Sequence, residues 1–129
     1  GYLVQSRNDA THYGYVFVDC TLTGAPGIER FVLARIEPVR FPHSHVVFVD
    51  CKIGSFLSPV GWQLDKAPGA DTPGPAAKIR FGEYRSTDLA GEPLGVGARL
   101  AASHQLTAVE AARMRDMAHV LSGWRPEEK

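Results

Sequence analysis

The sequence predicts an all-β fold built as a partial β-solenoid of stacked parallel strands, with one α-helix towards the C-terminal end. The pentapeptide VFVDC occurs at residues 16–20 and again at 47–51, in similar surroundings (GYVFVDCTLTG and HVVFVDCKIGS). Short segments rich in β-branched and aromatic residues alternate with Gly, Pro and Asn-Asp turns. A helical pattern then begins at Thr107.

The repeated pentapeptide suggests one structural unit used twice. Strand alternation places Val16, Val18 and Cys20 on one face and Phe17 and Asp19 on the other, and the second copy repeats this arrangement. If the copies stack, identical side chains lie one above the other, and we expect the valines inside and the phenylalanines outside. Such ladders are typical of a solenoid, in which each repeat contacts only its neighbours. The alternative is an antiparallel sandwich in which VFVDC recurs by chance.

We expect a single domain over residues 1–129, with strands in about 1–84, irregular structure in 85–106 and the helix in 107–122. The strands are expected at residues 2–5, 13–20, 30–36, 45–53 and 78–84. Residues 63–78 carry three Pro and two Gly without periodicity and are predicted to form a long loop.

The predicted helix starts with a capping box, in which Thr107 and Glu110 bond each other's backbone N–H groups. Gly123 is placed to end it. Its apolar stripe indicates a packing surface, so we expect the helix to seal or buttress the stack; the stripe consists of Val109, Met114, Met117, Val120 and Leu121.

Composition excludes several classes of protein. Fourteen Lys and Arg balance fourteen Asp and Glu, and basic clusters are missing, which argues against a nucleic-acid partner. The sequence has no apolar run of the ~18 residues that a membrane span needs, and no signal segment. Because the chain starts inside a strand-like run, we expect that an N-terminal part of the domain is missing.

The cysteines and histidines give weaker signals. Cys20 and Cys51 hold the same place in the two copies, and strand spacing allows either free thiols or a disulfide. His43 and His45 share a strand face, but a third ligand at suitable spacing is lacking, so we expect no metal and no cofactor.

The order of motifs resembles the C-terminal half of pectin methylesterases over nearly the whole chain. The motifs are QSRND, YGYVFVDCTLTG, FVLAR, SHVVFVDCKIGSFLSPVGW, FGEY, GVGARL and LTAVEAA followed by SGWRP. The resemblance implies a right-handed parallel β-helix of the pectin-lyase-like type. It also implies metal-free hydrolysis of the methyl esters of polygalacturonate (pectin), with one aspartate as nucleophile, a second as proton donor, and glutamines that stabilise the oxyanion.

The resemblance assigns catalysis to Arg35, which matches the arginine that hydrogen-bonds the nucleophilic carboxylate in an LGRPW motif. The corresponding residues here read LARIE, so Glu37 stands where a sugar-contacting Trp is expected. Alternation predicts Val32, Ala34 and Ile36 towards the core, and Phe31, Leu33 and Arg35 outward. Trp62 matches a tryptophan beside the cleft and either stacks on sugar or packs in the protein. The EY pair of FGEY is expected to be structural.

The catalytic aspartates of the family lie upstream of this chain, so we expect the 129 residues alone to be inactive. The leading hypothesis is therefore part of a secreted or periplasmic esterase that acts on pectin, monomeric at full length. An esterase of the same fold with another ester substrate is one alternative, because Glu37 replaces an aromatic residue. The other is a catalytically degenerate β-helix that binds carbohydrate or serves a structural role.

Overall fold

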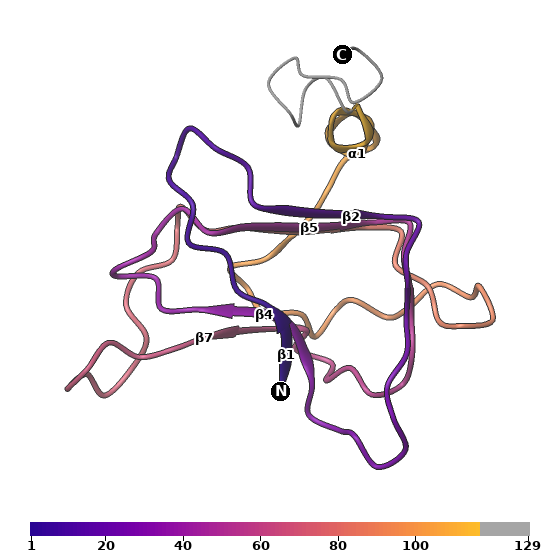
Figure 1. The fold of residues 1–129 in the computed structure, drawn as a ribbon, viewed down its shortest axis with the longest axis horizontal. Coiled ribbons are helices and arrows are strands. Elements are labelled where there is room, and N and C mark those ends of the chain that lie inside the picture. Colours follow the sequence, from indigo (N-terminus) through magenta and orange to yellow (C-terminus); the bar gives the residue numbers. More distant parts are fainter. Residues whose placement is uncertain (117–129) are drawn as a thin grey trace, which may run out of the picture.

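The computed structural model describes residues 1–116, in which short parallel strands form three sheets beside one helix (Figure 1). The first sheet has the strand order β1-β4-β7, the second β2-β5-β8-β9 and the third β3-β6, and neighbouring strands pair in parallel. The elements are β1 (Tyr2–Val4), β2 (Tyr15–Val18), β3 (Thr21–Leu22), β4 (Val32–Ile36), β5 (His45–Val49), β6 (Lys52–Ile53), β7 (Trp62–Leu64), β8 (Arg80–Tyr84), β9 (His104–Gln105) and α1 (Ala108–Arg115).

The chain visits the sheets in the same order on successive passes, which we call layers. Strands β1, β2 and β3 form the first layer, β4, β5 and β6 the second, and β7 and β8 the third. The two VFVDC copies pair in register, with Phe17 opposite Phe48 and the flanking valines opposite one another. This parallel pairing confirms an all-β fold with stacked copies and shows that the antiparallel sandwich is wrong.

The expected orientation of the copies is inverted. Phe17 and Phe48 lie in the main core, their ring centroids 4.6 Å apart and nearly parallel, whereas Val47 and Val49 face outward under α1. Alternation defines two faces but does not say which is inside, and here both are covered. Cys51 nevertheless shares the core with the phenylalanines, because Asp50 adopts a left-handed conformation (φ 53°) that breaks the alternation before it.

The five predicted strand segments all contain strands, but three short strands lie outside them, β3 directly after the second segment and also β7 and β9. Strand β7 begins at Trp62, at the edge of the predicted loop, and β9 lies in the segment expected to be irregular. Strands of two or three residues are too short to show a period. Strands β3, β7 and β9 are fixed by pairing with β6, β4 and β8, so they are set by tertiary contacts rather than by local sequence.

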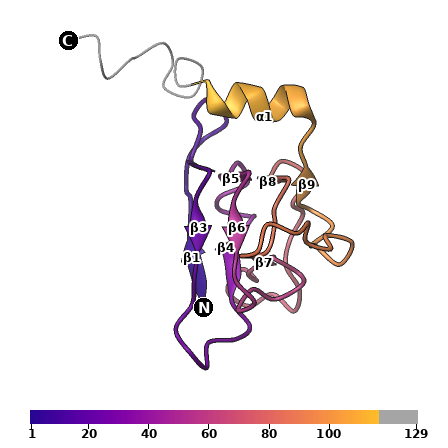
Figure 2. The same ribbon diagram turned by 90° about the vertical axis from the view of Figure 1, so that its right-hand side faces the viewer.

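Helix α1 lies across the outer face of the β2-β5-β8-β9 sheet (Figure 2). The capping box of Thr107 and Glu110 is confirmed, and the helix ends at Arg115 because Asp116 is extended, so it is shorter than predicted. Ala111 is buried and Met114 packs against Val47 and Val49, which makes the helix a buttress. Val109 is 63% exposed, contrary to its predicted place in the apolar stripe. Residues 117–122 and the rest of the stripe (Met117, Val120 and Leu121) lie outside the described residues.

Within residues 1–116, no helix has the length and apolar character to cross a membrane.

Cys20 and Cys51 are free thiols, and Cys51 Sγ points at the carbonyl oxygens of Phe17 and Val49, 3.6 Å from each. Burial raises the pKa of Cys51 to about 11, so this thiol is protonated at neutral pH and unreactive.

Candidate functional site

Arg35 lies on β4, the central strand of the β1-β4-β7 sheet, and its side chain is 41% exposed as predicted. The guanidinium carbon lies 4.4 Å from the centre of the Tyr2 ring, a cation–π contact with β1. Arg35 Nε lies 3.4 Å from Asp65 Oδ2, within ion-pair range, but it is buried and has no hydrogen-bond partner in the described residues. The guanidinium is thus held in place while one donor stays unused.

Polar side chains surround Arg35 on this sheet. Gln63 stands opposite Arg35 in the register of β4 and β7, and its Nε2 donates to Asp65 Oδ1 over 2.7 Å. Tyr2 is 38% exposed. An arginine, a carboxylate, an amide and an aromatic ring therefore share one side of the sheet, a set of groups that suits binding of a polar, ring-shaped ligand.

The outward orientation predicted for Leu33 is wrong, because this side chain is 1% exposed and belongs to the core, together with Ala34 and Ile36. The flanking loops cover this end of β4, and Leu33 lines an apolar hollow there with Phe31 and Phe56. Only Arg35 reaches the surface from β4, since Val32 is 4% exposed. Alternation therefore holds for Arg35 and fails earlier in the same strand.

Trp62 packs inside the protein, which was one of its two sequence-based interpretations. It is 1% exposed, stacks on Phe81 with ring centroids 4.6 Å apart, and meets Phe48 edge-on at 6.0 Å. Its place is set by the register, because Trp62 stands opposite Ala34 and so points into the core. With its ring covered in this way, Trp62 offers no face on which a sugar could stack.

Glu37 is also buried, at 4% exposure, so it does not stand at the surface where the motif would put a sugar contact. One carboxylate oxygen accepts from the backbone N–H groups of Val39 and Arg40, and the other accepts from Arg40 Nε over 3.2 Å. Glu37 thereby holds the turn that follows β4. Glu37 therefore shapes a turn rather than a binding surface.

The EY pair is structural, as expected, and its glutamate forms a buried ion pair. Glu83 is fully buried, and its oxygens accept from Arg99 Nε over 2.8 Å and from Ser86 Oγ over 2.7 Å. The Trp62 indole N–H also points to Glu83, at 3.4 Å. Arg99 in turn donates to the carbonyl of Pro59 over 2.9 Å, so the network joins the third layer to the loops before and after it.

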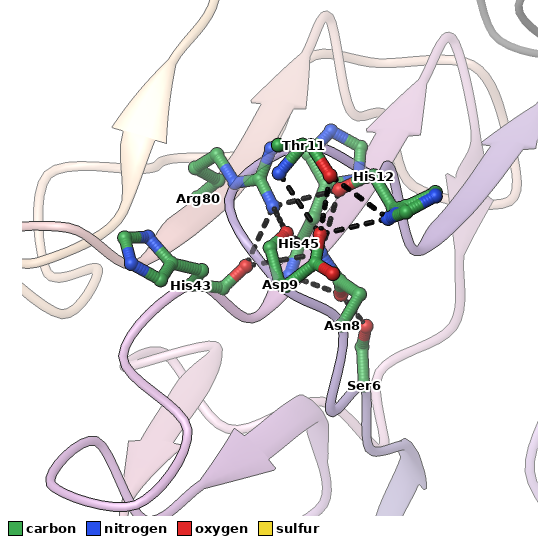
Figure 3. Close-up of polar contacts among 8 residues, drawn as sticks. All are labelled: Ser6, Asn8, Asp9, Thr11, His12, His43, His45 and Arg80. Atoms are coloured by element: carbon green, nitrogen blue, oxygen red, sulfur yellow. Dashed lines mark hydrogen bonds and ion pairs between the residues drawn. The ribbon is translucent and has the colours of Figure 1, made fainter.

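A second polar cluster, which the sequence did not reveal, joins the loops at the start of the second sheet (Figure 3). Arg80 Nη2 donates to the carbonyls of Asp9, His12 and His43 over 2.7–2.9 Å. The amide of Asn8 donates to the same three carbonyls, and its oxygen accepts from the His45 N–H over 3.2 Å. The cluster joins all three layers. Its members are far apart in the chain and share no motif, so local sequence gives no signal of it.

His45 belongs to this cluster and is held neutral. Its side chain is buried, and its Nδ1 accepts from the Gly14 N–H over 3.0 Å, which requires an unprotonated Nδ1. Burial, with a smaller effect of the Arg80 charge, lowers the pKa of His45 to about 4. A histidine with this pKa and this partner serves as a fixed acceptor at neutral pH.

Asp19, Asp50 and Arg85 hold corresponding positions after β2, β5 and β8, and all three are left-handed, with φ of 55°, 53° and 50°. Arg115 of α1 bonds the carboxylates of Asp19 and Asp50, and Arg85 bonds Asp50 over 2.9 Å. Hydrogen bonding to Arg115 lowers the pKa of Asp19. Burial acts to raise the pKa of Asp50, but the two arginines outweigh it and the pKa is lowered. The cluster fastens α1 to the first two layers.

Within residues 1–116, no group of three or more His, Cys, Asp and Glu side chains is arranged to hold a metal ion. His43 enters the polar cluster through its backbone carbonyl, and the Nδ1 of His45 is occupied by Gly14. No protein-family model and no curated protein matches the chain.

Proposed function

We propose that the chain is the C-terminal part of a right-handed parallel β-helix of the pectin-lyase-like type, and that the full-length protein is a carbohydrate esterase. Its substrate would be the methyl esters of polygalacturonate, and its place outside the cytoplasm, secreted or periplasmic, as a monomer. The regular return of the chain to three sheets supports the fold. The in-register pairing of the two VFVDC copies supports it further.

The observation that carries the proposed activity is the state of Arg35. Its guanidinium leans from β4 over Tyr2 of β1, and its Nε is buried without a hydrogen-bond partner in residues 1–116. In the described residues β1 pairs only with β4, so its other side is free to pair. A strand added there would lie ~4.8 Å from β1. A carboxylate on that strand would come within reach of the unused donor.

The reaction follows from such a pair. The carboxylate, kept ionised by Arg35, attacks the ester carbonyl; an acid protonates the leaving methoxide, and methanol departs, leaving an anhydride between enzyme and uronate. Water then attacks the anhydride and gives its proton to the same group, now a base, which frees the uronate and restores the carboxylate. The described residues supply only Arg35 to these steps, so the nucleophile and the acid belong to the N-terminal part that we propose.

The sugar contacts must differ from those in the motif, because Trp62 and Glu37 are buried. Tyr2, 38% exposed and in contact with the Arg35 guanidinium, is the aromatic ring that we propose for stacking on the sugar. Gln63, exposed on β7 at the other side of β4, offers an amide for the hydroxyl groups.

The test measures methanol release from methyl-esterified polygalacturonate by the full-length protein. Arg35→Ala should lower kcat/KM by about 10²–10³-fold, because it removes the positioning and charge stabilisation of the nucleophile. Lys66→Ala, which removes one positive charge from an exposed position in the loop after β7, is the matched control and should leave the rate unchanged. Methanol release by Arg35→Ala at the wild-type rate would contradict the role of Arg35.

One observation favours a second candidate, a β-helix that binds pectin without hydrolysing it. The Arg35 guanidinium already faces a carboxylate, Asp65, from the next layer. A pair that persists in the full-length protein would leave Arg35 as a binding group. Retention of the full-length protein in a pectin-containing gel, with no methanol released, would identify the binder and exclude the esterase.

A further inference from the structure

A cavity of about 430 Å³ opens between α1 and the second sheet, away from Arg35. This volume lies in the range of small-molecule sites, ~300–1,000 Å³. Its floor is apolar and preformed, with Ile79 buried at 2% exposure and the side chains of Leu106 and Met114 on the helix side. The Tyr13 and His45 rings line one wall, with ring centroids 4.9 Å apart.

The charges around the cavity are mostly positive. Lys78, Arg80 and Arg113 line it, and Glu110 is the one carboxylate among the lining residues. Glu110 is committed to the capping box through the backbone N–H of Thr107, which lowers its pKa. Three cations against one anion leave an excess of positive charge, which is unbalanced in a protein whose total charge is zero.

The cations have donors to spare. Within residues 1–116, the side chains of Lys78 and Arg113 make no hydrogen bond and no ion pair, and both are exposed at the rim. Arg80 uses Nη2 for three carbonyls, but its Nε is buried without a partner. A buried donor without a partner is destabilising, and a bound acceptor that reaches it would satisfy it.

From this arrangement we propose that the cavity binds a small organic carboxylate carried on a compact ring. The carboxylate would lie among Lys78, Arg80 and Arg113, and the ring would rest on the apolar floor beside Tyr13 and His45. The ligand would be a single anion rather than a phosphate, because Glu110 at the rim disfavours a second negative charge. This site is separate from the Arg35 surface and does not depend on the proposed esterase activity.

The test is an NMR titration of the full-length protein at pH 7 with four probes. Benzoate and galacturonate represent an aromatic acid and a sugar acid, and benzyl alcohol and galactose are their uncharged counterparts. We expect at least one acid to shift the amide resonances of residues 77–82 and 104–114, with a dissociation constant at least tenfold below that of its counterpart. The acid that binds more tightly identifies the kind of ring.

Two charge-reversal variants make the test specific. Lys78→Glu and Arg113→Glu should each weaken binding of the acid by about tenfold, since each replaces an attraction by a repulsion at the rim. Lys66→Glu makes the same change of charge at an exposed position that does not line the cavity, and it should bind like wild type. The proposal is overturned if neither acid shifts these resonances at tens of millimolar, if the uncharged probes bind equally well, or if the rim variants bind as wild type does.

Discussion

The two VFVDC copies have the same sequence but different surroundings. Both have a left-handed aspartate as their fourth residue, with φ values of 55° and 53°, so the backbone turns in the same way in the two copies. Their burial differs, because Phe17 is half-buried whereas Phe48 is fully buried. The second copy has β2 on one side and β8 on the other, whereas in the described residues the first pairs only with β5. The two copies therefore share a local conformation, while position in the stack sets their burial.

The residue two positions before each copy also differs in its surroundings. Gly14 precedes the first copy and His45 the second, and the two are joined by a hydrogen bond from the glycine N–H to His45 Nδ1. A Cβ at Gly14 would collide with the His45 carbonyl oxygen and with Ser6 Oγ. The first copy therefore needs a residue without a side chain there, because the backbone at His45 and the Ser6 side chain lie too close for a Cβ.

The largest expected difference between the copies is the cost of removing the ring. Phe48→Ala should lower the free energy of unfolding by about 3–5 kcal/mol, because it empties a fully buried site between Phe17 and Trp62. Phe17→Ala should cost about 1.5–3 kcal/mol, since part of that ring already faces solvent. Urea unfolding of both variants with a common m-value measures the difference. Equal losses in the free energy of unfolding would contradict the difference in burial between the copies and indicate that Phe17 is covered in solution.

A smaller difference between the copies should appear in how protein stability depends on pH, because the second copy is preceded by His45, which titrates, and the first by Gly14, which does not. Its pKa is about 4 in the folded protein, against about 6.5 when unfolded. The unfolded chain thus binds the extra proton first, and stability falls as the pH is lowered from 6.5 to 4, by about 3 kcal/mol at most. Arg80, which faces the ring, adds to this by repelling the imidazolium.

The measurement is urea unfolding between pH 7 and 4, with His45→Asn as the comparison. Asparagine keeps an acceptor for the Gly14 N–H but does not titrate, so the variant should lose most of the slope across this range. Asp9, whose hydrogen bonds with His12 and Thr11 lower its pKa to about 2, adds to the slope only below about pH 5, where the carboxyl of the unfolded chain takes up a proton, and it does so in both proteins alike. A slope that survives the substitution would assign the pH dependence to other titrating groups.

The repeat made most of the fold predictable, because identical segments that stack in parallel must pair in register. The orientation of the copies was not predictable, since VFVDC offers two apolar faces and only the packing of α1 on Val47 and Val49 decides between them. Of the predicted site residues, only Arg35 stands at the surface. The positions of Trp62 and Glu37 follow from register and from a turn, which a motif match does not report.

The smallest expected difference concerns Asp19 and Asp50, the fourth residues of the two copies. Asp50 bonds Arg85 and Arg115, whereas Asp19 bonds Arg115 alone and is 64% exposed. Asp50→Asn should therefore destabilise the protein by about 0.5–1 kcal/mol, and Asp19→Asn by less, while asparagine still accepts the left-handed backbone. Because the pKa of Asp50 is lowered, its contribution should be complete above pH ~4 and lost as the pH falls below that value.

Urea unfolding at low salt and at 1 M NaCl measures this last pair of variants, with Asp71→Asn in the exposed loop after β7 as the matched control. Salt should shrink the difference between Asp50→Asn and Asp19→Asn, because exposed ion pairs are screened. A larger loss from Asp19→Asn than from Asp50→Asn would reverse the order that the contacts predict. It would mean that α1 is held mainly on the first layer, and that the second copy owes its stability to burial alone.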